Sequence, residues 1–170
     1  KSISNRLLII HKIANSKLSI GNLSDADDTR ILNELLNSNT EKVNCGLGGT
    51  AIRFFLSYCY LINRNVIVAG EEALNNRPIA PLVDALRHLG AQIEYIDKED
   101  YPPVYLKETA KENNQVTFDA NISSQFVSAL LLIAPYLPKG ISIQLPVDQV
   151  SFSYINMTMA LMKMNGVEVT

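Results

Sequence analysis

The sequence predicts a mixed α/β (α+β) domain in which three related units surround a shared core. An apolar helix that opens with small, polar residues occurs three times, and each copy is followed by a short strand and a second, more amphipathic helix. The chain has 170 residues, of which 47% are hydrophobic, and this is enough for one compact core. We therefore expect repeated units about a pseudo-threefold axis, spanning approximately residues 1–44, 45–112 and 113–170.

The first unit begins with an apolar helix over residues 2–13, "SISNRLLIIHKI". A short strand is expected in the segment "KLSIGNL". A second helix is expected to start near Asp25 and Asp27, because acidic residues in a first turn favour the positive end of the helix dipole. Only the connection "NSNTEKVNC" separates this helix from the second unit, so the first unit is shorter than the others.

The second unit repeats the pattern with clearer boundaries. The helix "GGTAIRFFLSYCYL" leads to the strand "NVIVAG", and the next helix is expected to have Pro78 in its first turn and to end before Gly90. The β-branched run "QIEYI" predicts a further strand. The segment around Pro102 and Pro103 leaves room for an extra strand pair.

The third unit opens with the strand "QVTFDA", followed by the helix "SSQFVSALLLI" and the strand "ISIQL". Its second helix, "SYINMTMALMKMN", ends at Gly166, and the final "VEVT" predicts the beginning of another strand. Because the sequence stops within this strand and starts without methionine, we expect it to be a piece of a larger protein.

The first helix of each unit has no obvious polar face. We therefore expect these three helices to pack in the interior, parallel to one another, with the sheets and the second helices outside them. Parallel helices would bring their amino ends to one rim, near Ser2, Thr50 and Ser124.

The residues at this rim favour an anionic ligand. Free N–H groups at helix amino ends and in the glycine-rich loop "CGLGGT" can bind an anion. Arg6 and Arg77 have planar guanidinium groups, which suit phosphate or carboxylate. Each feature also has an ordinary explanation, since serines cap helices, "GLGGT" can be a simple turn and Arg77 can be a surface residue. Their recurrence at three helix starts favours a binding site for a small anion.

Composition and charge exclude several other classes of protein. A net charge of −2 and a pI near 5.7 provide no general attraction to nucleic acid or to a membrane surface, so neither partner is expected. The longest apolar runs fall short of the roughly 20 residues needed to cross a bilayer. Cys45 and Cys59 are too few for a disulfide framework and lack Cys–His metal spacing, and Cys59 is expected to be a buried thiol of a cytoplasmic protein.

Six motifs, in the order in which they occur, resemble the 5-enolpyruvylshikimate-3-phosphate synthase family: "KSISNR", "GGTAIRF", "NNRPIAPLVDALRHLGA", "YPPV", "ISSQFVSALLLIAP" and "VSFSYINMTMALM". The resemblance covers nearly the whole chain. It implies a fold of two lobes, each built from three βαβαββ units about a pseudo-threefold axis, with the active site in the cleft between them. The present chain then corresponds to most of one lobe, and the second lobe is absent from it.

The resemblance also implies roles for individual residues. Lys1 is implied to contact both substrates and to take part in proton transfer, which makes it the candidate catalytic residue. The residues implied to bind shikimate 3-phosphate are Lys1, Ser2, Arg6, Ser123, Ser124, Gln125, Ser151 and Tyr154. Those implied to bind phosphoenolpyruvate are Lys1, Gly49, Arg77 and Gln125. One departure is Leu47, which stands near the phosphoenolpyruvate pocket where the family commonly has asparagine.

The implied reaction is transfer of the enolpyruvyl group of phosphoenolpyruvate to the 5-hydroxyl of shikimate 3-phosphate with release of phosphate, a step of aromatic amino acid biosynthesis. The resemblance implies no metal, no organic cofactor, and inhibition by glyphosate at the phosphoenolpyruvate site. The expected partners are the two substrates and a second lobe of the same polypeptide, in a monomeric cytoplasmic enzyme. Residues 1–170 alone are expected to show no turnover.

Two alternatives stay open. UDP-N-acetylglucosamine enolpyruvyl transferase shares the architecture and the donor, but it has a reactive cysteine loop and a different opening motif, so "KSISNR" and "ISSQF" argue against it. The other alternative is a non-catalytic domain of the same fold that binds an anionic ligand.

Overall fold

The computed structural model describes residues 1–17, 19–118, 122–147 and 151–169. Its helices are α1 (Ser2–Ile13), α2 (Asp27–Asn37), α3 (Gly49–Leu61), α4 (Glu72–Asn75), α5 (Ala80–His88), α6 (Ser124–Ile133), the short 3-10 helix η1 (Ala134–Tyr136) and α7 (Phe152–Met164). All the helices predicted from the sequence are confirmed. However, α5 starts after Pro78 and has Pro81 in its first turn, because the backbone is still non-helical at Ile79. Within these ranges, no helix has the length and apolar character needed to cross a bilayer.

The strands of the described ranges form two sheets. They are β1 (Lys42–Asn44), β2 (Val66–Ala69), β3 (Ala91–Tyr95), β4 (Val104–Thr109), β5 (Gln115–Thr117) and β6 (Ser142–Gln144). In the larger sheet the order is β1-β2-β4-β3, with β1 parallel to β2 and with β4 antiparallel to both of its neighbours. The smaller sheet pairs β5 and β6 in parallel. The expected extra strand pair is therefore a single new strand, β4, which pairs with the predicted strand β3.

Three strand assignments made from the sequence are wrong. The segment "KLSIGNL" forms no strand over its described residues, and Asn22 there has a left-handed φ of 53°, which interrupts an extended run. By contrast, the strand β1 lies in the segment predicted to be a simple connection. Its three residues have one buried side chain, Val43, and so short a pattern does not predict a strand. Residues 167–169 are not in a strand, since no described strand pairs with them, and Thr170 lies outside the described residues.

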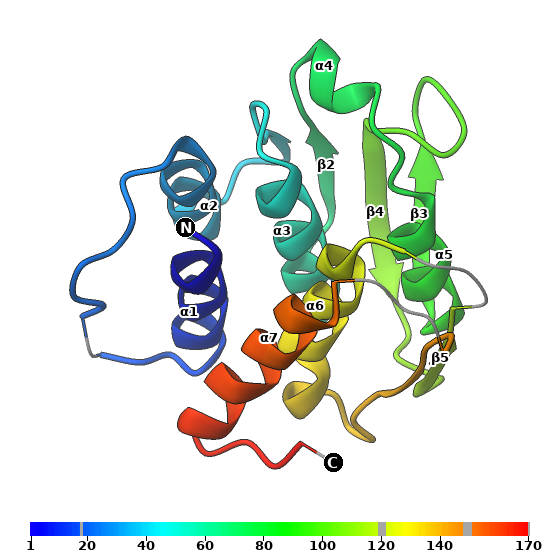
Figure 1. Cartoon of the computed structure of the whole chain (residues 1–170). Coiled ribbons are helices and arrows are strands. Elements are labelled where there is room, and N and C mark those ends of the chain that lie inside the picture. The colour runs from blue at the N-terminus through cyan, green and yellow to red at the C-terminus, as the bar shows by residue number, and fades with distance from the viewer. Residues whose placement is uncertain (18, 119–121, 148–150, 170) are drawn as a thin grey trace.

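Helices α3 and α6 form the centre of the core. Figure 1 shows them side by side, with α1 and α2 on one flank and the larger sheet with α5 on the other. Nearly every residue of α3 is buried, including Phe54, Phe55 and Tyr60, as the absence of a polar face predicted. Only six of the 12 residues of α1 are buried, and no described strand covers its outer side, which is the structural result of the shortened first unit.

Candidate anion-binding site

A polar pocket of about 410 Å³ opens where the amino ends of α1, α3 and α6 meet. This confirms the predicted common rim. The pocket brings together every residue that the resemblance implied, and its lining consists of Lys1, Ser2, Arg6, Asp28, Leu47, Gly49, Thr50, Arg77, Ser123, Ser124, Gln125, Ser151 and Tyr154. A larger cavity of about 720 Å³ between α6, α7 and β6 is lined mainly by apolar side chains. The polar pocket is the better candidate, because specific ligand sites need convergent polar groups as well as volume.

The start of α6 has a capping serine, Ser123, followed by the hydroxyl of Ser124 and the amide of Gln125. Ser123 is the N-cap residue, and its Oγ accepts a hydrogen bond of 3.4 Å from the backbone N–H of Gln125. Ser124 follows as the first helical residue and is only 6% exposed, while Gln125 is partly exposed. The ordinary capping explanation is therefore correct for Ser123, and it leaves the hydroxyl of Ser124 available at the edge of the pocket.

The loop before α3 allows charged side chains to approach the backbone closely. A Cβ atom added at Gly49 would lie 2.9 Å from Nη1 of Arg77 and 3.1 Å from Nη1 of Arg53, so any larger residue here would force these guanidinium groups to shift. Leu47 in the same loop is 58% exposed and lines the pocket. Leu47 thus faces the pocket and does not pack inward.

Arg6 is a buried cation held by neutral partners. Its guanidinium donates hydrogen bonds to Oγ1 of Thr158 at 2.6 Å, to Oγ of Ser128 at 2.9 Å, and to the carbonyl oxygens of Ser2 and Tyr154. The side chain is 2% exposed and lies over the ring of Phe54. Burial lowers the pKa of Arg6 to about 10, because an apolar environment disfavours the charged form.

Arg53 is a second buried cation, and sequence reasoning did not identify it. Its Nη1 donates to the carbonyl oxygen of Gly49 at 2.6 Å and its Nη2 to that of Pro78 at 3.1 Å, while the guanidinium lies over the ring of Phe126. Burial, with a contribution from the charge of Arg77, lowers the pKa of Arg53 to about 10. An arginine in the middle of an otherwise apolar helix was the signal that could have found it.

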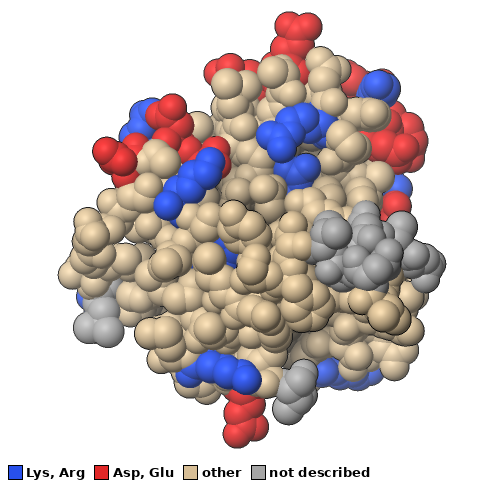
Figure 2. Space-filling model, viewed as in Figure 1, with Lys and Arg blue, Asp and Glu red and all other residues tan. Residues whose placement is uncertain are grey.

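No carboxylate of the described residues lies within ion-pair distance of Arg6 or Arg53. A buried charge normally has a partner, because desolvation costs several kcal/mol per ion. Arg6 lines the pocket, and Arg53 lies next to it through its hydrogen bond to Gly49, so two buried cations without a described carboxylate partner add to the positive potential of the helix amino ends. Figure 2 shows Lys and Arg side chains on the face where α1 and α3 begin, whereas acidic side chains are conspicuous along the upper edge of the molecule.

The mouth of the pocket carries the remaining predicted residues. Lys1 reaches over it from the residue before α1, and its Nζ forms an ion pair of 2.8 Å with Oδ2 of Asp28, a residue not predicted from the sequence. Ser151 is the N-cap of α7 with a left-handed φ of 60°, and its side chain makes no capping bond. The side chain of Tyr154 is 44% exposed. Ser151 and Tyr154 are thus open to a ligand.

Known proteins match this chain along nearly its whole length. The family model described as EPSP synthase (3-phosphoshikimate 1-carboxyvinyltransferase) matches residues 32–170. The 3-phosphoshikimate 1-carboxyvinyltransferase of Bacteroides fragilis strain YCH46 is 41% identical, and the match covers 96% of this chain and 40% of that protein. The protein of the same name from Enterobacter sp. strain 638 is 38% identical, and the match covers 99% of this chain and 45% of that protein.

A solved structure supports the fold. The EPSP synthase from Acinetobacter baumannii superposes with a TM-score of 0.81 at 17% identity, over all of this chain and 43% of that chain. The chain therefore spans less than half the length of the relatives that it matches. The match to the family model and the identity to the curated relatives lead to one conclusion: this chain belongs to the EPSP synthase (3-phosphoshikimate 1-carboxyvinyltransferase) family.

Proposed function

We propose that this chain forms most of one lobe of an enzyme that transfers the enolpyruvyl group of phosphoenolpyruvate to the 5-hydroxyl of shikimate 3-phosphate and releases phosphate. Membership of the family supports this proposal. The observation that carries it is the pair of buried arginines, Arg6 and Arg53, which lie without a described carboxylate partner beside a pocket formed by three helix amino ends. A second lobe of the same polypeptide would close the pocket and complete the site, because this chain corresponds to 40% of its relative from Bacteroides.

The acceptor is proposed to bind on the side of the pocket formed by α1, α6 and α7. The hydroxyls of Ser123 and Ser124 and the N–H groups at the start of α6 would bind the phosphate of shikimate 3-phosphate, with Ser2, Gln125, Ser151 and Tyr154 around the ring. Arg6 contributes chiefly through its charge, since four hydrogen bonds already engage its guanidinium. The same network orients the backbone of Ser2 and Tyr154.

The donor is proposed to bind between Gly49, Arg77, Gln125 and Lys1. The guanidinium of Arg77 lies beside Gly49, and the side chain is exposed. Arg77 forms no ion pair with a carboxylate of the described residues. A planar guanidinium can bind a carboxylate or phosphate group through two parallel hydrogen bonds. The backbone at Gly49 can approach phosphoenolpyruvate closely, because glycine carries no side chain.

The chemistry assigned to this lobe is positioning and stabilisation of charge. In the proposed reaction the acceptor 5-hydroxyl attacks C2 of phosphoenolpyruvate and loses its proton, while C3 of phosphoenolpyruvate gains a proton. The tetrahedral intermediate then loses phosphate from C2 and a proton from C3, which restores the C2–C3 double bond. Lys1 is proposed to take part in the proton transfer, and the cationic pocket would stabilise the negative charges of both substrates. We propose a cytoplasmic monomer, and the two free, buried cysteines, Cys45 and Cys59, support a reducing compartment.

An assay of the complete polypeptide tests the proposed function. Phosphate release should require both shikimate 3-phosphate and phosphoenolpyruvate, and UDP-N-acetylglucosamine should not replace the first of these. Turnover with the nucleotide sugar would favour the related transferase. Binding of shikimate 3-phosphate without any turnover would favour a non-catalytic domain.

Inorganic phosphate is expected to raise the melting temperature of the protein. An anion in the pocket would interact favourably with Arg6 and Arg53, and a ligand at 100 times its Kd stabilises the folded state by about 2.7 kcal/mol. Differential scanning fluorimetry can measure the shift, with sodium chloride at matched ionic strength as the control. Equal shifts in phosphate and in chloride would contradict a specific anion site.

The substitution Leu47→Asn is expected to tighten binding of phosphoenolpyruvate, and of glyphosate, while leaving that of shikimate 3-phosphate nearly unchanged. Leu47 is 58% exposed and lines the pocket, so an amide there is not buried and can donate to the donor substrate. The new hydrogen bond should contribute about 0.5–1.5 kcal/mol. Calorimetric titration of both variants measures it, and weaker donor binding in a variant of equal thermal stability would show that position 47 does not contact this ligand.

A further inference from the structure

The pocket contains one carboxylate, and the proposed function does not account for it. Asp28 is the only Asp or Glu among the described residues that line the pocket, whose other charged members are Lys1, Arg6 and Arg77. A negative charge beside a site for two anionic substrates weakens their binding through Coulomb repulsion. The presence of Asp28 therefore requires a function that offsets this effect.

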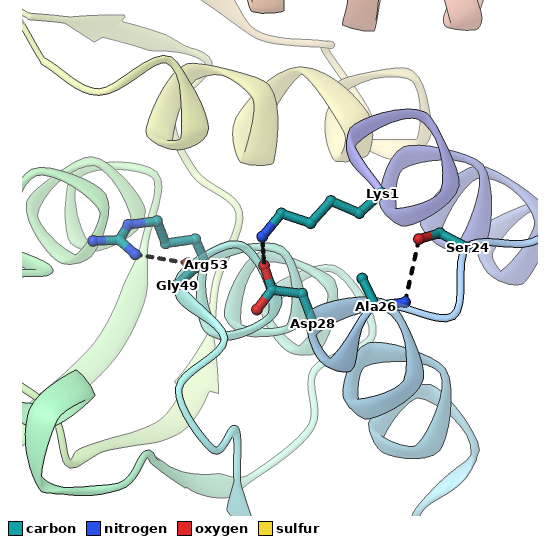
Figure 3. A network of polar contacts seen from close by, with 6 residues as sticks. All are labelled: Lys1, Ser24, Ala26, Asp28, Gly49 and Arg53. Atoms are coloured by element: carbon teal, nitrogen blue, oxygen red, sulfur yellow. Dashed lines mark hydrogen bonds and ion pairs between the residues drawn. The ribbon is translucent and has the colours of Figure 1, made fainter.

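Asp28 forms an unusually sheltered ion pair with Lys1. Its Oδ2 lies 2.8 Å from Nζ of Lys1, as Figure 3 shows, and its side chain is only 16% exposed. In the other ion pairs found within the described ranges the carboxylate side chains are 61% to 81% exposed. Exposed pairs contribute little to stability because water competes for both partners, whereas a sheltered carboxylate holds its partner more firmly.

The fold places the carboxylate of Asp28 between two segments. The segment before α2 is attached to α1, because Oγ of Ser4 accepts a hydrogen bond from the N–H of Ser24 at 3.1 Å. Within this segment, Oγ of Ser24 accepts the N–H of Ala26 at 3.3 Å, as Figure 3 shows. On the other side, Oδ1 of Asp28 lies 3.2 Å from the position that a Cβ on Gly48 would occupy. Asp28, in the first turn of α2, therefore directs its carboxylate toward the loop that precedes α3.

We infer that Asp28 is a positioning residue that holds the ammonium group of Lys1 over the pocket. This inference rests on the proposed function, in which Lys1 contacts both substrates. A lysine side chain that is 54% exposed would otherwise sample many rotamers, and ordering it costs free energy at each turnover. One N–H of the ammonium group binds Asp28, which leaves two N–H groups to face the substrates. Asp28 acts through Lys1 and does not itself touch the reacting atoms.

The substitution Asp28→Asn in the complete enzyme tests this role, with Asp27→Asn as the matched control. Asp27 lies in the same helical turn, its side chain is 81% exposed, and it pairs with Arg30 away from the pocket. Both changes remove one charge from the start of α2, so any effect through the helix dipole is shared. We expect Asp28→Asn to lower kcat at least tenfold with both KM values within about threefold of the original, and Asp27→Asn to leave kcat unchanged. The variant Asp28→Glu should restore part of kcat.

Two further measurements separate positioning from a structural role. The melting temperatures of the two asparagine variants should agree within a few degrees, because the basic partner of each carboxylate is more than half exposed and such ion pairs contribute little to stability. In a Lys1→Met background, Asp28→Asn should change the affinity for shikimate 3-phosphate no more than Asp27→Asn does, since the residue through which Asp28 acts is gone. A kcat of Asp28→Asn within twofold of the original, or a large additional effect in the Lys1→Met background, would overturn the inference.

Chemical labelling of Lys1 tests its contact with Asp28 without requiring the proposed reaction. Acetylation of Lys1 by acetic anhydride, measured by mass spectrometry relative to Lys12, should become at least threefold faster in Asp28→Asn and should not change in Asp27→Asn. Faster labelling in a protein without carboxyvinyl transfer would keep the Asp28–Lys1 assignment and reject the proposed reaction. Unchanged labelling, with or without turnover, would reject the assignment itself.

Discussion

Replacing Arg6 by methionine is expected to weaken binding of shikimate 3-phosphate by roughly 10- to 100-fold, about 1.5–3 kcal/mol, without lowering the free energy of unfolding. The two effects have one cause. Arg6 is 2% exposed and has no carboxylate partner among the described residues. Its buried charge therefore lowers the stability of the fold when the pocket is empty, and it strengthens the binding of an anion to the pocket. Methionine has a similar length and removes this charge.

The polar partners of Arg6 keep hydrogen bonds after the substitution. Oγ of Ser128 and Oγ1 of Thr158 are 2.9 Å apart and can bond to each other, and Thr158 also donates to the carbonyl oxygen of Tyr154. Deleting one partner of a buried network is costly mainly when the others are left unpaired. We therefore expect unchanged or higher stability, which is the usual result when an apolar side chain replaces buried charges.

Urea denaturation and calorimetric titration of the complete enzyme measure both quantities. Arg64→Met is the control, because Arg64 also donates to backbone carbonyl oxygens and lies over the ring of Phe55, yet it does not line the pocket. The control should leave substrate affinity unchanged. A large loss of stability in Arg6→Met with normal affinity would mean that Arg6 is purely structural.

The second large effect is expected from Arg77→Ala, which should raise the KM for phosphoenolpyruvate by roughly 10- to 100-fold. Loss of one charge-assisted contact costs about 1.5–3 kcal/mol. Arg77 is exposed, and the charge of its guanidinium is directed at the pocket, beside Gly49. The fold should therefore tolerate the change, and the melting temperature should stay within a degree or two of the original.

The companion substitution Ser124→Ala should instead raise the KM for shikimate 3-phosphate. Ser123, not Ser124, caps α6, so the alanine keeps the helix start intact and removes only a hydroxyl from the pocket. Steady-state kinetics with each substrate varied in turn separates the two effects. If both substitutions left both Michaelis constants unchanged, the assignment of donor and acceptor sides would be wrong. Arg30→Ala, on the exposed face of α2, serves as the charge control.

Local signals in the sequence were sufficient to predict which helices form the site and where they begin. Polar residues ahead of apolar helices predicted α1, α3 and α6, and the repeated order of elements predicted that their starts would meet. Arg53 and Asp28 were missed because their roles depend on what folds against them. Nothing near Arg53 in sequence shows that its charge lacks a carboxylate, and nothing near Asp28 shows that Lys1 reaches it.

Strand errors have a related cause. A strand is stable only with a neighbour, so a three-residue segment such as β1 forms because β2 is available, while a similar run at residues 167–169 has no described partner. Helices satisfy their own backbone and were therefore predicted more reliably.

The hydrogen bond from Arg6 to Thr158 also determines when the site can form during synthesis. The two residues are 152 positions apart, so the ribosome must add and release most of the chain before the guanidinium meets its hydroxyl partners. Until α7 docks, Arg6 stays in water, and the base of the pocket has no fixed geometry. A nascent chain therefore cannot form the base of the pocket before α7 has been made, and an anionic ligand could assist folding only after that point.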